Sequence, residues 1–237
     1  MSWINKDTQV YCSFAKNAGN TGCQMMNSAF YYYNLNKIYK SFSVDSIADA
    51  ARAVRTLGIR GFAITMPYKR EVLGYVDEID SSAAIGAANT VINNGIILKA
   101  YNTDYSAALE YLNSCKDILK DRALYILGSG GYAAAVRAAA KELQLQTQFI
   151  TRDTWGDLFE IKNGVIYNCT PVEDLNEQID DSNVFIDCIV TTGRHLATLQ
   201  AAHQFKLYTG LEFPFGADEC YAINDRNQHG MKKLNIV

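Results

Sequence analysis

Hydrophobic and polar positions along the first hundred residues predict short strands that alternate with amphipathic helices. Stretches rich in β-branched and aromatic residues predict strands over residues 8–14, 37–44, 59–66, 89–93 and 96–102. Met26, Phe30 and Tyr33 are spaced to share one face of a helix, which we expect over residues 23–35. The tyrosine run that begins at Tyr31 is expected to join the core rather than face a partner, because an aromatic face on an amphipathic helix is usually buried.

Local signals predict where several of these elements begin and end. Asp45 is the expected N-cap of a second helix, and Gly58 is its expected stop. Pro67 ends the third strand, and a short helix is expected over residues 68–76. Asn94-Gly95, which lies between two apolar runs, predicts a β-hairpin.

The second half of the chain has continuous apolar runs rather than alternating ones. These runs predict strands over residues 123–128, 147–151, 165–170 and 184–190. Helices are expected over residues 104–115 and from the first of these strands through Leu143. Because continuous apolar strands separated by helices indicate a parallel sheet covered on both faces, we predict an α/β fold. Two lobes are expected, joined near residues 102–104.

Composition narrows the classes of protein to consider. The chain has 237 residues, of which 49% are hydrophobic and 20% charged, as in an ordinary globular protein. Its net charge of −3 argues against a nucleic-acid partner, and no apolar run approaches the ~20 residues that a membrane span needs. Six cysteines without a CxxC pair and only three histidines predict no metal site. The N-terminus lacks a signal-peptide pattern, so we expect a cytoplasmic protein with reduced cysteines.

The segment LGSGGYAAAV joins a predicted strand to a predicted helix through a glycine-rich turn. Gly128, Gly130 and Ala133 form a GxGxxA pattern in this segment. Such a turn needs a small first residue, a second residue without a side chain so that backbone N–H groups approach a pyrophosphate, and a small third residue for packing. The pattern predicts a dinucleotide site that also includes Gly131 and Tyr132.

The end of the next strand bears on which dinucleotide this site would hold. Thr151 is followed there by Arg152 and Asp153. An acidic residue at this place binds the ribose hydroxyls of NAD, whereas an arginine binds the 2′-phosphate of NADP. Because arginine pairs with phosphate through two hydrogen bonds and stacks on adenine, we favour NADP and keep NAD as the alternative.

Three polar residues stand at the ends of apolar elements, namely Lys69, Asn89 and Asp104. Each has an ordinary structural explanation, as a solvated lysine, a turn residue and a helix N-cap. However, polar residues at such ends also line the crevices of α/β folds. Together with the dinucleotide turn, they predict a proton-transfer pair beside a hydride-transfer site.

Four segments, in their order and spacing, resemble the shikimate dehydrogenase family: MPYKREV, IGAANTVINNG, LKAYNTDY and LGSGGYAAAV. The similarity continues through the TRD strand end, the NCTP string at residues 168–171 and the segment 193–210. It spans the chain from about Val10 to Gly210, and the chain looks closest to the shikimate dehydrogenase-like branch of the family.

The resemblance implies a two-lobe NAD(P)-dependent dehydrogenase that interconverts 3-dehydroshikimate and shikimate with NADP(H), a step of aromatic amino acid biosynthesis. Residues 1–103 and 205–237 would form a substrate-binding catalytic domain, residues 104–204 a Rossmann-like NADP-binding domain, and the cleft between them the active site. Lys69 matches the family's catalytic lysine and Asp104 its paired aspartate. The positions that match its substrate contacts are Asn20, Thr65, Asn89 and Gln200. The positions that match its cofactor side, besides the glycine turn, are Thr151, Arg152, Asn168, Cys169, Thr170, Gly193 and Leu196.

The chemistry of this assignment is consistent with the residue types. Hydride transfer to a ketone builds negative charge on oxygen, which a lysine ammonium can stabilise and then protonate. Burial lowers the pKa of a lysine, whereas a nearby carboxylate raises it. Our hypothesis is that Asp104 orients Lys69, so that the two act as one proton-handling unit.

The sequence departs from the family pattern in two places. Asn20 and Gly22 stand where the family holds the substrate carboxylate with two serine hydroxyls, and losing both without replacement would cost about 3–6 kcal/mol. Val190 replaces a family tyrosine, and only two threonines separate it from Gly193. These changes favour low activity on shikimate or action on a closely related small hydroxy acid. The alternative is a degenerate, non-catalytic protein of the same fold that binds a dinucleotide or a small acid.

Two further expectations complete the picture. A folate-linked dehydrogenase on a similar two-lobe plan is disfavoured by the NTD and MPYK strings. The expected partners are a small-molecule substrate and, for a homodimer, a second copy of the chain; a monomer is equally compatible with the sequence.

Overall fold

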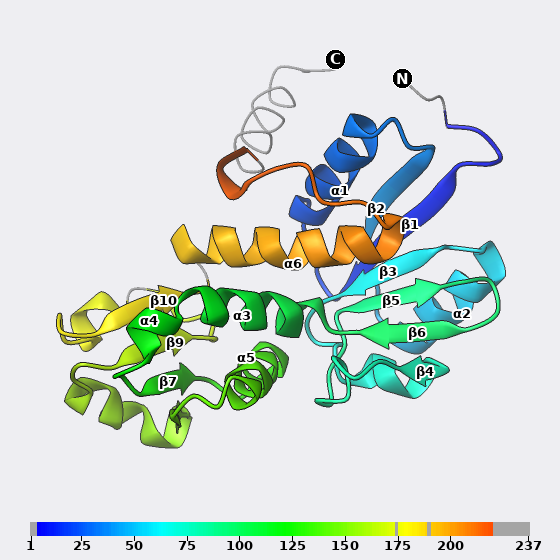
Figure 1. Cartoon of the computed structure of the whole chain (residues 1–237). Coiled ribbons are helices and arrows are strands. Elements are labelled where there is room, and N and C mark those ends of the chain that lie inside the picture. Colours follow the sequence, from blue (N-terminus) through cyan, green and yellow to red (C-terminus); the bar gives the residue numbers. More distant parts are fainter. Residues whose placement is uncertain (1–3, 174, 189–190, 220–237) are drawn as a thin grey trace, which may run out of the picture. The chain divides into compact units, whose positions relative to one another are not determined.

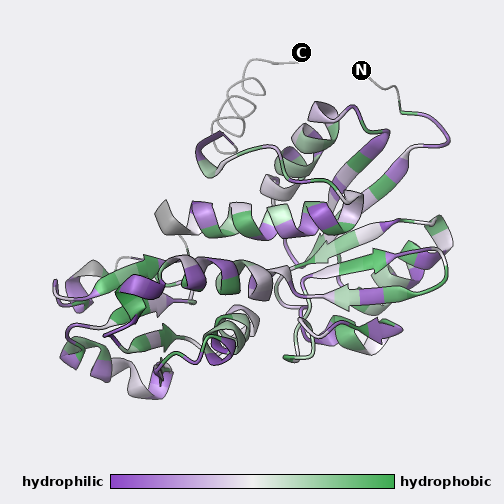
Figure 2. Ribbon diagram, viewed as in Figure 1, coloured by the Kyte–Doolittle hydropathy of each residue, from purple (hydrophilic) through white to green (hydrophobic). Residues whose placement is uncertain are grey.

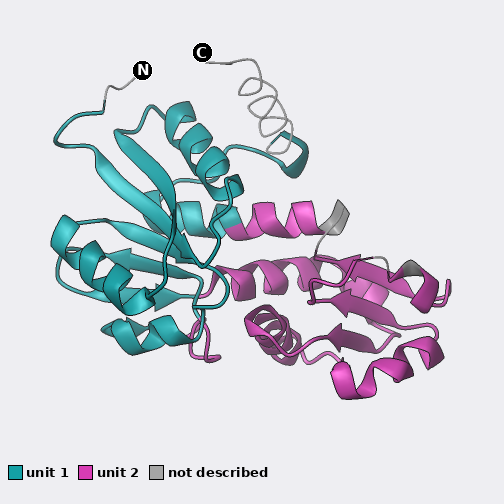
Figure 3. Cartoon of the chain, turned by 180° about the vertical axis from the view of Figure 1, so that it is seen from behind, with its two compact units in different colours: residues 1–80, 88–101, 201–237 teal, residues 81–87, 102–200 magenta. Residues whose placement is uncertain are grey.

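The fold is known from a computed structural model, which describes residues 4–173, 175–188 and 191–219. The chain divides into two compact units (Figure 3). Unit 1 comprises Met1–Asp80, Ala88–Tyr101 and Ala201–Val237, and unit 2 comprises Ser81–Ala87 and Asn102–Gln200. The prediction of an α/β fold is confirmed, since each unit is a β-sheet with helices packed on it.

Unit 1 contains a six-stranded mixed sheet in the order β2-β1-β3-β5-β6-β4. Its strands are β1 (Gln9–Ala15), β2 (Lys37–Ser43), β3 (Gly61–Ile64), β4 (Glu78–Ile79), β5 (Thr90–Asn93) and β6 (Leu98–Tyr101). β1 is parallel to β2 and β3, whereas β5 is antiparallel to both β3 and β6. The predicted hairpin is confirmed, because Asn94 N–H donates to the Ile97 carbonyl at 3.3 Å and Gly95 has a φ of +95°.

Helices cover both faces of the unit 1 sheet (Figure 1). They are α1 (Thr21–Tyr32), α2 (Ile47–Leu57), the 3₁₀ helix η1 (Glu71–Tyr75) and the last part of α6 (Thr191–Thr209). Phe30 of α1 packs with Phe205 and Tyr208 of α6 and with Tyr11 of β1 in one core. α2 and η1 pack against each other beside the opposite face.

Several helix ends differ from the sequence expectation. Ser46, and not Asp45, is the N-cap of α2, because its hydroxyl accepts a hydrogen bond from Asp49 N–H at 3.2 Å. Gly58 ends this helix as expected, in the left-handed conformation with a φ of +64°. The helix expected over residues 68–76 begins only at Glu71, so the residues before it form a turn.

The tyrosine run of α1 is the clearest departure from the expected core. Met26 and Phe30 are buried as predicted, but Tyr31 and Tyr32 are 72% and 62% exposed. These two side chains follow Phe30 directly along the helix, which turns them away from the buried face. Tyr33 is half-buried and stacks on the ring of Phe205.

Unit 2 contains a four-stranded parallel sheet in the order β10-β9-β7-β8. Its strands are β7 (Leu124–Leu127), β8 (Thr147–Ile150), β9 (Val165–Asn168) and β10 (Val184–Asp187). The α-helices are α3 (Thr103–Ser114), α4 (Lys116–Leu119), α5 (Gly131–Glu142) and the first part of α6, and the 3₁₀ helices are η2 (Arg152–Glu160) and η3 (Asn176–Gln178).

The central strands β7 and β9 of the unit 2 sheet are almost entirely buried, as the continuous apolar runs predict, whereas Gln148 and Phe149 of the edge strand β8 are exposed. Figure 2 shows the hydropathy of these strands. Ile126 packs with Val136 of α5 and the neighbouring α-helices. The next residue, Leu127, points to the opposite face and packs with Ile150 and with Leu158 of η2. This Rossmann-like arrangement places two separate cores on the two faces of one parallel sheet.

In the described part of the chain, the structure shows no membrane-spanning helix, no disulfide and no metal-ligand cluster. None of the described helices combines the length and the apolar character that a bilayer crossing requires. The five cysteines within the described ranges are free thiols, and Cys220 lies outside them. Those ranges contain no group of three His, Cys, Asp or Glu side chains arranged to hold a metal ion.

Candidate functional site

Backbone hydrogen bonds bring three of the predicted site residues together in unit 1. Ile64 N–H donates to the Asn89 carbonyl at 2.8 Å, and Ala88 N–H donates to the Lys69 carbonyl at 2.7 Å. Thr65 directly follows β3, and Asn89 directly precedes β5, the antiparallel neighbour of β3. As a result, Thr65, Lys69 and Asn89 lie at the same end of adjacent strands.

The turn that carries Lys69 is anchored by a buried tyrosine. The Tyr68 hydroxyl donates to the Val44 carbonyl at 2.7 Å, and Tyr68 N–H donates to the Thr65 carbonyl at 3.0 Å. Tyr68 is buried, whereas Lys69 beside it is half-buried. The anchored backbone therefore limits the positions that the Lys69 side chain can reach.

A chain of buried hydrogen bonds orients the amide of Asn89. Gln204 Nε2 donates to Thr90 Oγ1 at 2.8 Å, and Thr90 Oγ1 donates to Asn89 Oδ1 at 3.1 Å. All three residues are buried. The sequence analysis did not identify Thr90 or Gln204, although Gln204 lies one helical turn after Gln200 and therefore on the same side of α6.

The predicted carboxylate loop lies at the start of α1. Asn20 is exposed and is the N-cap of α1, without a side-chain capping bond. Cys23, in the first turn of the helix, has its Sγ 3.1 Å from Ser41 Oγ, which in turn accepts a hydrogen bond from Ser13 Oγ at 2.9 Å. Polar side chains from β1 and β2 therefore border the helix N-terminus where the two family serines are replaced.

In unit 2, Asp104 and Gln200 meet at the first turn of α3. Gln200 Nε2 donates to Thr103 Oγ1 at 2.8 Å, and Thr103 directly precedes Asp104. Asp104 is buried and is not the N-cap, because Asn102 Oδ1 accepts from Tyr105 N–H at 3.0 Å and so caps the helix. Thr103 and Asn102 were not singled out from the sequence as site residues.

The charge of Asp104 acts on two neighbouring side chains. Burial raises the pKa of Tyr132 and of Cys169 well above their ordinary values, and the Asp104 carboxylate adds to both rises. The Tyr132 hydroxyl also lies 2.9 Å from the Tyr167 hydroxyl. The carboxylate of Asp104 is therefore near two of the predicted cofactor-side residues.

The register of the parallel sheet aligns the predicted cofactor residues at one edge. Leu127 is paired with Ile150 on one side and with Asn168 on the other. The residues that follow these partners are Gly128, Thr151 and Cys169, so all three leave the sheet at its carboxyl edge. In open α/β sheets, ligands bind outside this edge.

The two glycines of the turn, Gly128 and Gly130, differ in what a side chain would contact at each position. Gly128 has a φ of +101°, and a Cβ placed there would lie 2.9 Å from Thr170 Cγ2. Gly130 is the N-cap of α5, and a Cβ placed there would meet nothing within 4 Å. The first turn of α5 contains no acidic residue, and Ala133 packs into the core. Open space before an uncapped helix N-terminus fits a pyrophosphate, because the N–H groups of the first turn attract an anion.

Asn168 supports the loop after β9 from inside the protein. Its Oδ1 accepts from Thr170 N–H at 2.9 Å and from Thr170 Oγ1 at 2.7 Å. Its Nδ2 donates to the Val172 carbonyl at 3.1 Å and to Asp187 Oδ1 at 3.2 Å. Because Asn168 is fully buried, its contribution is to hold this loop in place.

The remaining predicted cofactor residues divide into an exposed and a packed group. Arg152 and Asp153 are exposed at the start of η2. Gly193 is packed, because a Cβ placed there would lie 2.4 Å from the Cys188 carbonyl oxygen, and Leu196 belongs to the core of unit 2. The substitution expected at Val190 lies outside the described residues.

Comparison with known proteins assigns the chain to a family. The substrate-binding domain of shikimate dehydrogenase matches residues 21–91. A shikimate dehydrogenase-like protein of Haemophilus influenzae is 42% identical over 139 residues, which are 58% of this chain and 51% of that protein. A shikimate dehydrogenase (NADP(+)) of Clostridium beijerinckii is 30% identical over 182 residues, which are 69% of this chain and 67% of that protein. The chain belongs to the shikimate dehydrogenase family.

Solved structures of family members agree with this assignment. A shikimate 5-dehydrogenase-like protein superposes with a TM-score of 0.81 at 30% identity, covering 94% of this chain and all (100%) of the other. A shikimate dehydrogenase solved in complex with NADP+ superposes with a TM-score of 0.76 at 27% identity, covering 95% of this chain and 98% of the other. In sequence, however, the matched region spans about half of the Haemophilus relative and 40% of a Caldanaerobacter subterraneus relative.

Proposed function

We propose that this protein is an NADP-dependent oxidoreductase that interconverts 3-dehydroshikimate and shikimate, or a closely related small hydroxy acid. The observation that carries the proposal is the pair of backbone hydrogen bonds that gathers Thr65, Lys69 and Asn89 at one end of β3 and β5. These residues match the family's catalytic lysine and two of its substrate contacts. A cytoplasmic location and a role in aromatic amino acid biosynthesis belong to the same proposal.

In this proposal, Lys69 handles the proton of the reaction. NADPH, when bound, supplies a hydride to the carbonyl carbon of the substrate. The Lys69 ammonium stabilises the negative charge on the oxygen and donates a proton to it. Asp104, which the family resemblance pairs with this lysine, is its proposed partner in proton transfer.

Amide and hydroxyl side chains would hold the substrate hydroxyls. Asn89 is suited to this role because the hydrogen bonds from Gln204 through Thr90 fix the orientation of its amide. Thr65 and Gln200 are the other proposed substrate contacts, and Asn20 is the proposed contact to the carboxylate. A preoriented amide loses less conformational freedom on binding than a mobile one.

The cofactor preference follows from the residues at the carboxyl edge of the unit 2 sheet. The open space at Gly130 supports a pyrophosphate site on the first turn of α5. Arg152, exposed at the end of β8, is the proposed contact to the 2′-phosphate. Asp153 beside it would favour NAD, which remains the alternative cofactor.

A second candidate function is binding of a dinucleotide or small acid without turnover. Two observations favour it: Asn20 is an exposed N-cap where the family has a serine, and the backbone at Gly193 is packed against the Cys188 carbonyl at the shortened connection. A lost contact to the carboxylate would lower turnover efficiency about ten- to a hundredfold.

One assay separates the two functions. Purified full-length protein is incubated with NADP+ and excess shikimate, with parallel reactions in NAD+ and with quinate. A steady increase in reduced-nicotinamide absorbance supports the oxidoreductase and excludes the binding-only function. Cofactor binding measured by calorimetry without turnover on either acid would support the second function, and absence of both would overturn the two together.

A further inference from the structure

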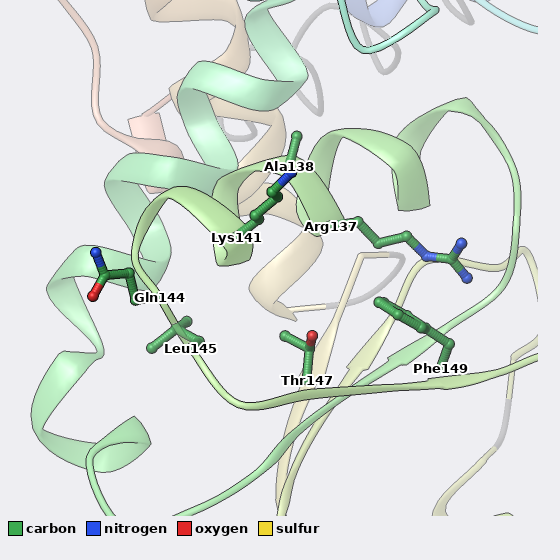
Figure 4. Close-up of a pocket in the computed structure, with 7 residues that line it drawn as sticks. All are labelled: Arg137, Ala138, Lys141, Gln144, Leu145, Thr147 and Phe149. Atoms are coloured by element: carbon green, nitrogen blue, oxygen red, sulfur yellow. The ribbon is translucent and has the colours of Figure 1, made fainter.

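Arg137, near the middle of α5, connects the glycine turn to strand β8. Its Nη2 donates a hydrogen bond to the Gly128 carbonyl at 3.2 Å. Its guanidinium carbon lies 4.0 Å from the centre of the Phe149 ring. Figure 4 shows the two side chains beside each other. Neither the sequence pattern nor the family resemblance identified this arginine.

The guanidinium of Arg137 has two contacts and one further buried donor. Its Nε is buried and has no hydrogen-bond partner among the residues that the structure describes. The Phe149 ring is 44% exposed, so the guanidinium stacks on it close to the protein surface. The ring contact and the hydrogen bond to the Gly128 carbonyl together fix where the guanidinium lies.

The hydrogen bond to Gly128 fixes the orientation of a peptide group in the turn. The carbonyl of Gly128 and the N–H of Ser129 belong to one planar trans peptide, and they point in opposite directions. Gly128 has a φ of +101° and no Cβ, and a residue without a side chain allows this peptide several orientations about the Cα–C bond. Arg137 selects one of them by holding the carbonyl oxygen.

The Arg137 cation also lies near the carboxyl edge of the sheet. Burial raises the pKa of the Cys169 thiol, and the Arg137 guanidinium acts against that rise. Cys169 follows β9, while Gly128 follows β7 and Phe149 is in β8. The positive charge is therefore close to the ends of the three strands from which the proposed cofactor residues extend.

From these contacts we infer that Arg137 is a positioning residue for the dinucleotide, which holds the Gly128–Ser129 peptide in the orientation that receives the pyrophosphate. The inference rests on the proposed function, because it assumes that this turn binds a dinucleotide. Phe149 serves as the platform that keeps the guanidinium under the turn. Arg137 itself need not touch the cofactor.

Lys141 provides a matched control for charge. It lies one helical turn after Arg137 and lines the same surface hollow, together with Thr147 and Phe149 (Figure 4). Among the hydrogen bonds of the described residues, none joins Lys141 to the glycine turn. Replacing Lys141 therefore removes one positive charge from the same place without removing the anchor.

The test compares Arg137→Met, Arg137→Lys and Lys141→Met with the unaltered full-length protein. NADPH affinity is measured by fluorescence titration, and the KM values for NADP+ and shikimate, kcat and Tm are measured in parallel. We expect Arg137→Met to raise the Kd for NADPH and the KM for NADP+ about tenfold, the effect of losing one charge-assisted hydrogen bond. Arg137→Lys is expected to recover part of the affinity. Lys141→Met should bind NADPH as tightly as the unaltered protein does. The values of kcat and of the KM for shikimate should change little in all three variants.

Two results would overturn the inference in distinguishable ways. If Arg137→Met lowers Tm but leaves the Kd for NADPH equal to that of Lys141→Met, the arginine is structural only and the proposed function is unaffected. If the unaltered protein does not bind NADPH, the proposed function fails and the inference fails with it. Should Arg137→Met not fold, Phe149→Leu, which removes the platform, must still weaken NADPH binding for the inference to stand.

Discussion

The carbonyl of Lys69 accepts a hydrogen bond from Ala88 N–H at 2.7 Å, which fixes the turn before η1 against the residue that precedes Asn89. Two segments that are separated in the sequence thus share one backbone contact at the end of β3 and β5. The contact holds the backbone of Lys69 beside the residue that precedes Asn89 and does not depend on either side chain. Substitution of the half-buried Lys69 can therefore test chemistry without removing this backbone contact.

Replacing Lys69 by alanine should remove most of the proposed activity. We expect kcat/KM for shikimate to fall about 10²- to 10⁴-fold, because a general acid contributes that much to proton transfer. The Tm should change little, since the contact to Ala88 uses the backbone. Lys40→Ala, at an exposed position on β2, is the control and should keep normal kinetics. Retention of most of the turnover by Lys69→Ala would show that the lysine is not the proton donor.

The Thr90–Gln204 hydrogen bond can be examined with a double-mutant cycle. Gln204→Leu leaves the buried Thr90 hydroxyl with one partner fewer, so we expect a loss of about 1–3 kcal/mol in the free energy of unfolding by urea. Adding Thr90→Val removes the hydroxyl that has lost its Gln204 donor and should recover part of that loss. Both variants should also raise the KM for shikimate, because Asn89 loses its orienting bond. Additive losses in the double mutant would mean that the two side chains do not interact.

The two glycines of the turn should respond differently to alanine. Gly128→Ala forces a side chain onto a left-handed backbone and against Thr170, so we expect it to lower stability by about 1–3 kcal/mol or more. Gly130→Ala has free space for its Cβ and should cost less than about 1 kcal/mol, in line with the small preference of N-caps for glycine over alanine.

Gly130→Ala should instead weaken cofactor binding, since its methyl group enters the space proposed for the pyrophosphate. We expect the Kd for NADPH to rise at least about tenfold, which is equivalent to 1.4 kcal/mol. Thermal unfolding and fluorescence titration of the same preparations separate the two effects. Unchanged NADPH affinity in Gly130→Ala would locate the cofactor elsewhere.

Alkaline pH should destabilise the protein in part through Tyr105. Burial, and then the hydrogen bond to Glu142 and its charge, raise the pKa of Tyr105 to about 12. In the unfolded chain this hydroxyl ionises near pH 10, so the unfolded state releases its proton first and stability falls as pH rises from about 10 to 12.

Tyr105→Phe should therefore flatten the decrease of the free energy of unfolding across that pH window. Urea unfolding at a series of pH values measures the slope. Below about pH 9 the difference between the two proteins should be independent of pH, because tyrosine is neutral in both states there. An unchanged slope above pH 10 would mean that Tyr105 ionises equally well in the folded protein.

The sequence alone predicted most of the elements because their signals are local. The apolar runs around Ile126 and Ile166 identify parallel strands, and the pair Asn94-Gly95 identifies a hairpin, without reference to any distant residue. Lys69, Asn89 and Asp104 stood out as polar residues at the ends of such elements. Their grouping as a site came from the family resemblance, which compares spacing over the whole chain.

The features that the sequence did not predict depend on contacts between distant residues. Gln204 and Thr90 are 114 positions apart and form a hydrogen bond only after α6 packs on the sheet. Arg137 has an ordinary place on a helix, and its bond to Gly128 depends on the path of the turn. The N-cap of α2, by contrast, is a local feature. Asp45 and Ser46 are adjacent and both favourable N-cap residues, so the sequence alone did not separate Ser46 from Asp45.

One turn of α6 carries Gln200 and Gln204, whose amides reach Thr103 in unit 2 and Thr90 in unit 1. A helix advances by about 100° per residue, so a residue inserted between Gln204 and Phe205, which packs in the unit 1 core, would turn the Gln204 amide away from the Thr90 hydroxyl. Natural or engineered variants can therefore change the side chains around Gln204 more readily than its position along the helix relative to Phe205.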